Sequence, residues 1–523
     1  MPEMTLPGTA LKVQSARHTR ITATVGIVGT ARLGSTDPTP LTSIDEAVQH
    51  FGSGGSTEHY PLTLVQAVQL AFANGAPRVV AVRVPGELAE TAIFALQPPN
   101  APPGPQALTF MAVAPGQAYN AAQIDIEPTH PVNGALGGTP QPPHPGAGHS
   151  GSGLPFPPSF PPGTTPPPNT LTLTITLGDE VERWEQVPDA AAQFVQVVNG
   201  THTGYDYNKY ATTGGASALF KAAYRNMGPV PGEPLALASL NQSVTPGPVN
   251  LRVSGTDGYA PDYVPGLDRL LNEDLQFVVL AGQGLELAAD LIAHVEAASQ
   301  PTMQRERLGI IGSTTTTLAD LLENIPRQAE GRLIVVAPGI RVVDPYTRHI
   351  VTLPATYTAA AVAGCLSALA PHESATNKRL HVAGLERQFN HVELGQLVAE
   401  NILMLENQVG SVRIVRGVAA TEPNSEWAQI TTRRVADDVL RRVRLLTDGF
   451  LHLQNTLPVR HALKSRVHEL LGGMVAQGVL TRYSLSTSVS DDDSIPEALT
   501  LHLAIRPIFS LDYVHMVIDL EGM

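Results

Sequence analysis

The residues of this 523-residue chain that could do chemistry lie in short motifs, and each motif is incomplete. Val25-Gly-Ile-Val-Gly29 and Gly282-Gln-Gly284 resemble dinucleotide-binding loops. The first lacks the middle glycine at the required spacing, and the second has Leu287 where the third glycine belongs. No Gly-Lys dipeptide occurs, so the Walker loop that holds phosphates is absent. Tight strand-to-helix turns explain both glycine sets without a ligand, and we predict no cofactor.

Other candidate motifs are also incomplete. Gly-x-Ser-x-Gly, which presents a serine nucleophile, does not occur. His372-Glu373 and His468-Glu469 have no second histidine four positions on, so neither predicts a zinc helix. Asp491–Asp493 lacks the loop glycine and distal glutamate of an EF-hand, and we interpret it as a solvated turn. We therefore predict no catalytic residue and no metal site, and expect that the chain is not an enzyme.

The composition excludes several kinds of partner. There are 33 basic and 47 acidic residues, a formal charge of −14, and aromatic residues make up 5%. This argues against direct nucleic-acid binding, which needs clustered cations or stacking aromatic rings. The one cysteine, Cys365, permits no disulfide within the chain and suits a reducing compartment. The segment from Met1 to Ala16 has no apolar core, and no apolar run of about 20 residues predicts a membrane-spanning helix.

One region departs from this acidic character. Between residues 433 and 466 there are three acidic residues, Asp437, Asp438 and Asp448, and eight basic ones: Arg433, Arg434, Arg441, Arg442, Arg444, Arg460, Lys464 and Arg466. One interpretation is a solvated helix face with internal pairs such as Arg433/Asp437 and Asp438/Arg442. The other is a docking face for an acidic partner. Composition alone leaves both open and slightly favours the first.

The elements that would position these residues begin as an α/β pattern. We expect a strand at 21–29, a helix opened by a Ser43/Glu46 capping box, a helix at 62–74 and a strand at 79–84. From Pro128 to Pro168 there are 14 prolines and 8 glycines in 41 positions, which predicts a surface loop or flexible projection. Thr170–Leu177 alternates perfectly and predicts a half-buried strand.

The α/β pattern then returns and changes again near the end. Apolar strands at 275–281, 308–312 and 333–337 alternate with helices at 285–298 and 318–325, which predicts a parallel sheet covered on both faces. A small-residue helix at 359–370 holds Cys365, most simply a packing residue. We expect helices at 392–406, 431–446 and 459–479, and alternation from Leu499 to Ile505 and from Val514 to Leu520.

In order, these pieces resemble the contractile tail sheath family of bacteriophages and related injection machines. The resemblance covers both chain ends and most of the α/β part, but not about 98–230. It is carried by Leu6-Pro-Gly8 with Leu11 and Val13, by Ile21–Ala31 with Arg32-Leu-Gly34, by Pro40–Glu46 to Phe51-Gly52, by Leu64–Gly75 with Val79–Val84, by Pro371 to Leu380, by Gly417-Val418, and by Trp427 to Arg434. The aromatic residue of the family's Pro-Gly-Val-Tyr-Val arm is missing here.

The resemblance implies an α/β and α+β multidomain fold in five parts. These are an extended N-terminal arm (1–20), a middle α/β domain with a mostly parallel sheet (21–97 and 201–360), a β-rich outer insertion (98–200) with its Pro/Gly-rich loop (128–169), an inner α+β domain (361–511) built with both chain ends, and a C-terminal strand arm (512–523).

The resemblance also implies partners. Copies of the chain would stack as hexameric rings around an inner tube, bounded by baseplate and terminator or cap proteins. Particles would assemble in the bacterial cytoplasm and act as a virion tail or injection particle. Arms from both ends, carrying Leu6, Leu11 and Val13 and Val514, Met516, Ile518 and Leu520, would add strands to neighbouring subunits. The basic helices would face the tube.

Alternation near a chain end agrees with strand addition, because an unpaired strand is a template for another chain. Both ends could instead pair within their own subunit. Two further interpretations of the whole chain stay open. One is an α/β hydrolase or nucleotide-dependent enzyme with a long lid, for which Asp344, His349 and Asp262 are candidates that no spacing unites. The other is a surface-display or adhesion protein.

Overall fold

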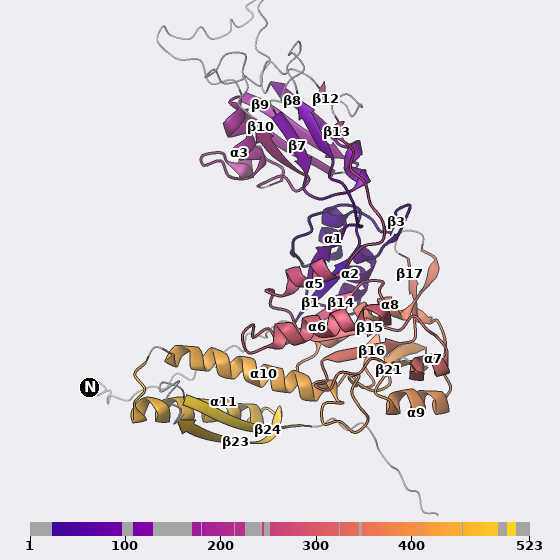
Figure 1. Ribbon diagram of the computed structural model, residues 1–523, viewed down its shortest axis with the longest axis vertical. Helices are drawn as coiled ribbons and strands as arrows, with labels where there is room; N and C mark the ends of the chain where they lie inside the picture. The colour runs from indigo at the N-terminus through magenta and orange to yellow at the C-terminus, as the bar shows by residue number, and fades with distance from the viewer. Residues whose placement is uncertain are drawn as a thin grey trace, which may run out of the picture.

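The computed structural model describes most of the chain between residues 23 and 508 (Figure 1). The described residues are 23–96, 108–128, 170–178, 180–213, 215–224, 243–244, 251–323, 325–344, 348–408, 410–451, 453–489 and 499–508. The predicted arms at 1–20 and 512–523 and nearly all of the Pro/Gly-rich loop lie outside them. Figure 1 shows three packed units in a row: a β-rich unit, a large-sheet unit and a helical unit with one β-hairpin.

The large-sheet unit is built on one wide sheet. Among the described residues, nine strands pair in the order β19-β22-β21-β16-β15-β14-β1-β5-β2. Their bounds are Arg379–Leu380, Ser411–Ile414, Leu403–Gln408, Leu333–Ala337, Leu308–Gly312, Phe277–Leu280, Thr24–Gly29, Arg78–Arg83 and Thr39–Leu41. The six strands from β21 to β5 run parallel, and β2, β22 and β19 pair antiparallel to their neighbours. The mostly parallel sheet predicted from the sequence is confirmed.

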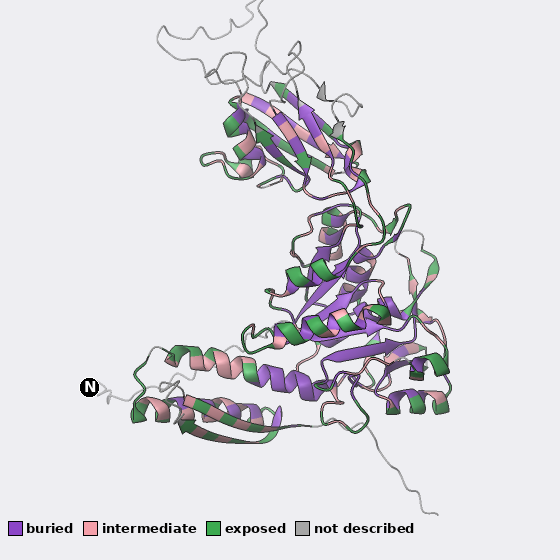
Figure 2. Ribbon diagram, in the orientation of Figure 1, coloured by how far each residue is buried: buried purple, intermediate pink, exposed green. Residues whose placement is uncertain are grey.

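Helices cover both faces of this sheet. One face packs against α1 (Ile44–Phe51), α2 (Leu64–Ala73) and α8 (Ala355–Ala368). The other packs against α5 (Val264–Leu270), α6 (Ala288–Ser299), α7 (Leu318–Glu323) and α9 (His391–Ala399). Central strands are buried on both faces, which explains their unbroken apolar sequences (Figure 2). Cys365 is buried inside α8, as its small-residue helix predicts, and burial raises the pKa of its thiol to about 11.

Two sequence-based expectations need correction here. The helix expected at 392–406 ends at Ala399, and residues 403–408 form β21 instead. Asn401 has a left-handed backbone (φ 61°) and its side-chain amide donates to the carbonyl groups of Thr421 and Glu422, which breaks the helix before the strand. At α1, Ser43 accepts from the Glu46 amide as predicted, but the Glu46 carboxylate accepts from the Thr42 amide rather than closing the box on Ser43.

Domain boundaries also shift. Strands β19, β21 and β22 belong to the large sheet, although residues after 360 were assigned to the inner domain. They join it because β21 pairs in parallel with β16, which extends the apolar sheet by one buried strand. The described strands between residues 220 and 253 join the β-rich unit rather than the middle domain.

The β-rich unit consists of two small antiparallel sheets. One has the order β10-β9-β8-β12 (Glu180–Pro188, Thr170–Leu177, Gln123–Pro128, Ser243–Val244), and the other β11-β7-β6-β13 (Phe220–Tyr224, Leu108–Ala112, Ile93–Leu96, Leu251–Val253). Strand β9 matches the predicted bounds. The sheets share an aromatic core with α3 (Ala191–Val198), in which Phe94 and Phe220, and Phe110 and Phe194, meet edge to face.

The helical unit is drawn in light orange to yellow in Figure 1. Helix α10 (Ile430–Thr447) leaves the large sheet, and α11 (Leu457–Ala476) runs beside it. They cover one face of a hairpin made by β23 (Leu480–Val489) and β24 (Leu499–Pro507). Val435 and Val439 of α10, with Leu463, Val467, Leu471 and Met474 of α11, form the core between these layers.

The half-buried carboxyl of Glu180 in the β-rich unit predicts that the stability of the fold depends on pH. Burial, aided by the neighbouring charge of Glu182, raises the pKa of Glu180 to about 7. The folded state therefore binds this proton more tightly than the unfolded state, so stability falls as the pH rises from about 4.5 and the loss is complete above about 7. We expect Glu180→Gln to raise the melting temperature at pH 8, with the gain shrinking toward pH 5. An equal gain at both pH values in thermal denaturation would contradict the assignment.

Candidate interaction surfaces

The predicted interaction residues fall into two groups. The arm residues Leu6, Leu11 and Val13, and Val514, Met516, Ile518 and Leu520, lie outside the described residues. The predicted basic residues lie on α10 and α11. The structure therefore brings the basic group together on one helix pair, with two members in unexpected surroundings.

Those two members are Arg433 and Arg434, which were expected on an exposed basic face. Each is 7% exposed, because the first half of α10 is buried against the large-sheet unit (Figure 2). They cannot belong to an exposed docking face, which corrects the expectation for these two residues. The Arg433/Asp437 and Asp438/Arg442 pairs predicted from spacing are present, with closest N–O distances of 2.6 and 3.0 Å. The first is buried rather than solvated.

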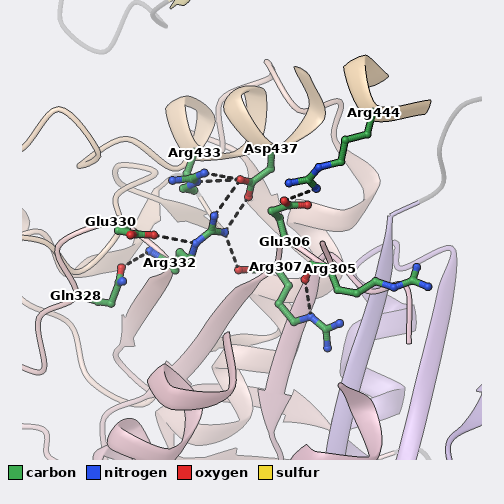
Figure 3. Close-up of polar contacts among 9 residues, drawn as sticks. All are labelled: Arg305, Glu306, Arg307, Gln328, Glu330, Arg332, Arg433, Asp437 and Arg444. Carbon is green, nitrogen blue, oxygen red and sulfur yellow. Dashed lines mark hydrogen bonds and ion pairs between the residues drawn. The ribbon is translucent and has the colours of Figure 1, made fainter. Parts of the chain in front are cut away.

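Asp437 is the centre of a buried ionic cluster (Figure 3). Its two carboxylate oxygens accept from the two terminal nitrogens of Arg332, at 3.1 and 3.2 Å. Oδ1 also accepts from Nε and Nη2 of Arg433, at 3.0 and 2.6 Å. Glu330 pairs with Arg332 Nε at 3.3 Å from the solvent side. The cluster thus joins α10 to the loop before β16.

Further contacts compensate the buried charges of Arg332 and Arg433. Arg332 also donates to the carbonyl group of Arg307, and its own amide donates to the side chain of Gln328. The guanidinium of Arg433 lies 4.6 Å from the centre of the Trp427 ring, a cation–π distance. Arg332 and Arg433 thus face the carboxylates of Asp437 and Glu330. Removal of the buried Asp437 would leave the two arginines as uncompensated buried charges.

Arg434 makes a second attachment on the other side of α10. It donates to the carbonyl groups of Leu369 and Ala370, at 2.7 and 3.3 Å, and lies over the ring of Phe277 in β14. Burial lowers the pKa of Arg434 to about 10, so the side chain stays charged at neutral pH. The start of α10 is therefore fixed to the loop after α8 and to a central strand.

The remaining basic residues are more exposed. Arg444 pairs with the buried carboxylate of Glu306, and Arg442 pairs with Asp438. Arg460 donates to the side chain of Asn455, and Arg466 pairs with Glu469 on the solvent side of α11. Arg441 and Lys464 are half-buried. These six residues, Arg441, Arg442, Arg444, Arg460, Lys464 and Arg466, are what remains of the predicted basic face.

The structure adds an apolar feature that the sequence reasoning missed. Four leucines, Leu445, Leu451, Leu453 and Leu457, are exposed where α10 turns into α11, and Leu451 reaches 79%. We call this group the leucine tip. The helices expected at 431–446 and 459–479 leave Leu451, Leu453 and Leu457 outside both, and no pattern assigned these leucines a role. A usable signal was Leu-x-Leu at 451–453, which lies outside both helices.

The β23–β24 hairpin has open edges. Its two strands pair only with each other among the described residues, so each presents one unpaired edge. Residues of β24 alternate between half-buried and exposed, and the half-buried Leu499, Leu501, Leu503 and Ile505 pack toward the helices. A further strand could pair at either edge and extend the cover over the helices.

No described helix combines the length and apolar character that crossing a membrane requires. Within the same ranges, no group of three or more His, Cys, Asp or Glu side chains is placed to hold a metal ion. The residues considered for an enzyme lie on separate elements. Asp344 and His349 close the turn after β17 (Ile340–Val343), and the Asp262 carboxylate accepts from the Val264 amide at the start of α5. At Gly282, an added Cβ would lie 2.5 Å from Thr63, which indicates close packing there.

Comparison with solved structures identifies the fold. The chain is similar to a sheath tail protein from Listeria innocua, with a TM-score of 0.60 and 12% identity, over 94% of this chain and 93% of the other. It is also similar to a sheath tail protein from Desulfitobacterium hafniense, with a TM-score of 0.54 and 11% identity, over 93% and 97%. The resemblance to tail sheath proteins predicted from the sequence is thereby confirmed, and the chain has their fold.

A third match has less weight. The sheath complex of an extracellular contractile injection system in its contracted state has a TM-score of 0.42 and 14% identity, over 51% of this chain and 77% of that one. The first two matches define the fold. No family model matches the sequence, and no curated protein matches it. The likeness is therefore one of structure.

The ionic cluster predicts a large stability effect at one position. Asp437→Ala would leave Arg332 and Arg433 buried without their shared carboxylate, and we expect the free energy of unfolding to fall by about 3–5 kcal/mol. Glu330→Ala removes the exposed partner of the same arginine and should cost at most about 1 kcal/mol. Chemical denaturation with hydrogen exchange of the α10 amides measures both. Equal effects of the two substitutions would contradict the proposed role of the buried carboxylate.

Proposed function

We propose that this chain is the sheath subunit of a contractile tail or injection particle. Copies would stack as hexameric rings around an inner tube and would contract to drive the tube through a target envelope. The single observation that carries the proposal is the likeness to two sheath tail proteins over more than nine-tenths of the chain. A mechanical role rather than catalysis suits a fold whose dinucleotide-like glycine motif serves close packing.

The β23–β24 hairpin supports linkage of subunits through strand addition. Its open edges would accept the terminal arms of neighbouring copies, residues 1–20 and 512–523. The apolar residues of the arms, Leu11 and Val13 near the start and Val514, Met516, Ile518 and Leu520 near the end, alternate as those of β24 do. An added strand would therefore place apolar side chains over α10 and α11. These ladders would persist as hinges while the subunits move as rigid bodies.

The basic face and the leucine tip support contact with the tube. The leucine tip lies where α10 ends and α11 begins, away from the large sheet (Figure 1). Apolar contact would supply affinity, while Arg460 and Lys464 would attract an acidic tube surface. Exposed ion pairs contribute about 0–1 kcal/mol each. Such contacts are weak enough individually to break one after another during contraction.

The linkage is tested by truncation. Deletion of residues 1–13, or of residues 512–523, should leave a folded protein that no longer forms long polymers, because neighbouring hairpins lose their added strand. Circular dichroism checks folding, and negative-stain electron microscopy checks assembly. Long tubules formed by both truncated proteins would show that the arms do not link the subunits.

The tube contact is tested by charge reversal. Arg460→Glu with Lys464→Glu should abolish co-assembly with an acidic tube protein while polymerisation of the sheath protein alone continues, since the reversal turns attraction into repulsion. Arg183→Glu, which disrupts an exposed pair with Glu185 in the β-rich unit, is the control. Co-sedimentation with the tube reads out the result, and undiminished binding by the double variant would refute the contact.

A further inference from the structure

The connection between the β-rich unit and the large-sheet unit presents an exposed apolar and acidic surface. The chain crosses there twice, at residues 84–92 and 253–263, and the turn of the β3–β4 hairpin (Gly55–Ser56 and Pro61–Leu62) lies against it. We call these segments the elbow. Leu88 is 82% exposed and Tyr259 is 61% exposed, and the ring of Tyr259 packs on His59 at 5.3 Å.

The elbow is a built joint rather than a loose linker. Backbone hydrogen bonds join its two crossings, among them Tyr259 to Glu87 at 2.9 Å and Thr256 to Glu90 at 3.0 Å. The buried guanidinium of Arg83 donates to the carbonyl groups of Ala31, Gly34 and Pro115 and so ties the two units together. The elbow surface therefore keeps a constant shape.

Leu88 has both an unfavourable backbone conformation and an unfavourably exposed side chain. Its backbone is left-handed, with φ of 60°, a region that favours glycine and asparagine over a residue with a branched side chain. Its side chain is also left in water. Strained backbone positions cluster at functional sites, and this one holds a large apolar group outward beside the exposed Tyr259.

A polar hollow of about 510 Å³ lies beside the elbow. Its acidic members are Glu58 and Asp257, Arg32 is its basic member, and the rest of the lining is polar or small. The two crossings add Glu87, Glu90 and Asp262, and they contain no lysine or arginine. The surface thus suits a partner segment that carries arginine beside apolar side chains.

The same chain presents a segment of that kind. Strands β17 (Ile340–Val343) and β18 (Ile350–Leu353) form a hairpin that we call the finger. One face packs on the core through Val342 and Val351. The opposite face exposes Val343 and Ile350, which are cross-strand partners, together with Arg341, and Arg348 is exposed in the turn before β18.

We infer that the elbow of one copy receives the finger of a second copy. Val343 and Ile350 pack on Leu88 and Tyr259, and an arginine of the finger reaches the carboxylates of the hollow. Two different surfaces meet, so the contact is heterologous, a type that builds either closed rings or open helical polymers. The inference rests on the proposed self-assembly and adds a contact between the folded units themselves.

Leu88→Asn gives a first test, because it separates folding from contact. Asparagine tolerates the left-handed backbone and prefers water, so the melting temperature should rise while the critical concentration for polymerisation also rises. A change confined to the melting temperature would show that Leu88 makes no contact between copies.

Charge exchange between two variants tests the pairing itself. Glu58→Lys with Glu87→Lys reverses the elbow, and Arg341→Glu with Arg348→Glu reverses the finger. Each variant alone should show a critical concentration raised about tenfold or more, because like charges then meet. An equal mixture should polymerise close to wild type, since each elbow again meets an opposite finger. This recovery also shows that both variants are folded.

Sedimentation of each protein and of the mixtures gives the readout. Glu323→Lys, an exposed acid on α7, is the matched control and should polymerise as wild type does. Recovery of the elbow variant by Arg460→Glu with Lys464→Glu, and not by the finger variant, would show that the elbow contacts the basic face of α11 and would overturn the inference. Polymerisation of the elbow variant and of the finger variant at the critical concentration of the wild type would overturn it too. Failure of the wild type to polymerise would refute the proposed function and the inference with it.

Discussion

The shared carboxylate of Asp437 is the constraint on which the arrangement of this molecule depends. It is held by Arg332 from the large-sheet unit and by Arg433 from its own helix, and all three side chains are less than one-tenth exposed. A buried ionic cluster contributes little net stability compared with apolar packing, but its bidentate arginine–carboxylate hydrogen bonds are geometrically specific. Here that geometry fixes how α10 leaves the large sheet, and α10 in turn positions α11 and the hairpin (Figure 3).

This placement gives a physical account of the proposed mechanics. The helical unit shares few apolar contacts with the large sheet, because its core is a separate cluster between α10, α11, β23 and β24. Load applied to the hairpin by a neighbour's strand would therefore pass through α10 and its ionic attachment. The ion pairs of Asp437 with Arg332 and Arg433 fix the direction of α10 without a broad apolar interface. Such an attachment suits a subunit that must move as one body while its strand contacts persist.

The sequence predicted those features that depend on local pattern. Strand β9 has the predicted bounds, because alternation from Thr170 to Leu177 reports burial on one face, and the parallel sheet follows from unbroken apolar strands. The i,i+4 pair of Arg433 and Asp437 was also predictable, since helical spacing brings them together. What could not be predicted was its burial. Arg332 lies 105 positions before Asp437, and nothing local marks it as the third member.

Local pattern also misled at specific places. The apolar run through Leu403 and Met404 satisfies a helix and a buried strand equally, and Asn401 decides between them through contacts with residues 421 and 422. The leucine tip was not predicted, because Leu451, Leu453 and Leu457 lie outside the two expected helices and form no periodic pattern. For the terminal arms, the sequence supports an expectation of strand addition, and the open edges of β23 and β24 add a place for it.

The most direct measurement of the central claim is a cryo-electron microscopy map of the polymer formed by the full-length protein. The account predicts rings of six copies in which strands from neighbouring chains continue the β23–β24 sheet, with Arg332 still paired to Asp437 in every subunit. A map in which each chain's two ends fold back on its own hairpin, with no strand ladder crossing between copies, would contradict it.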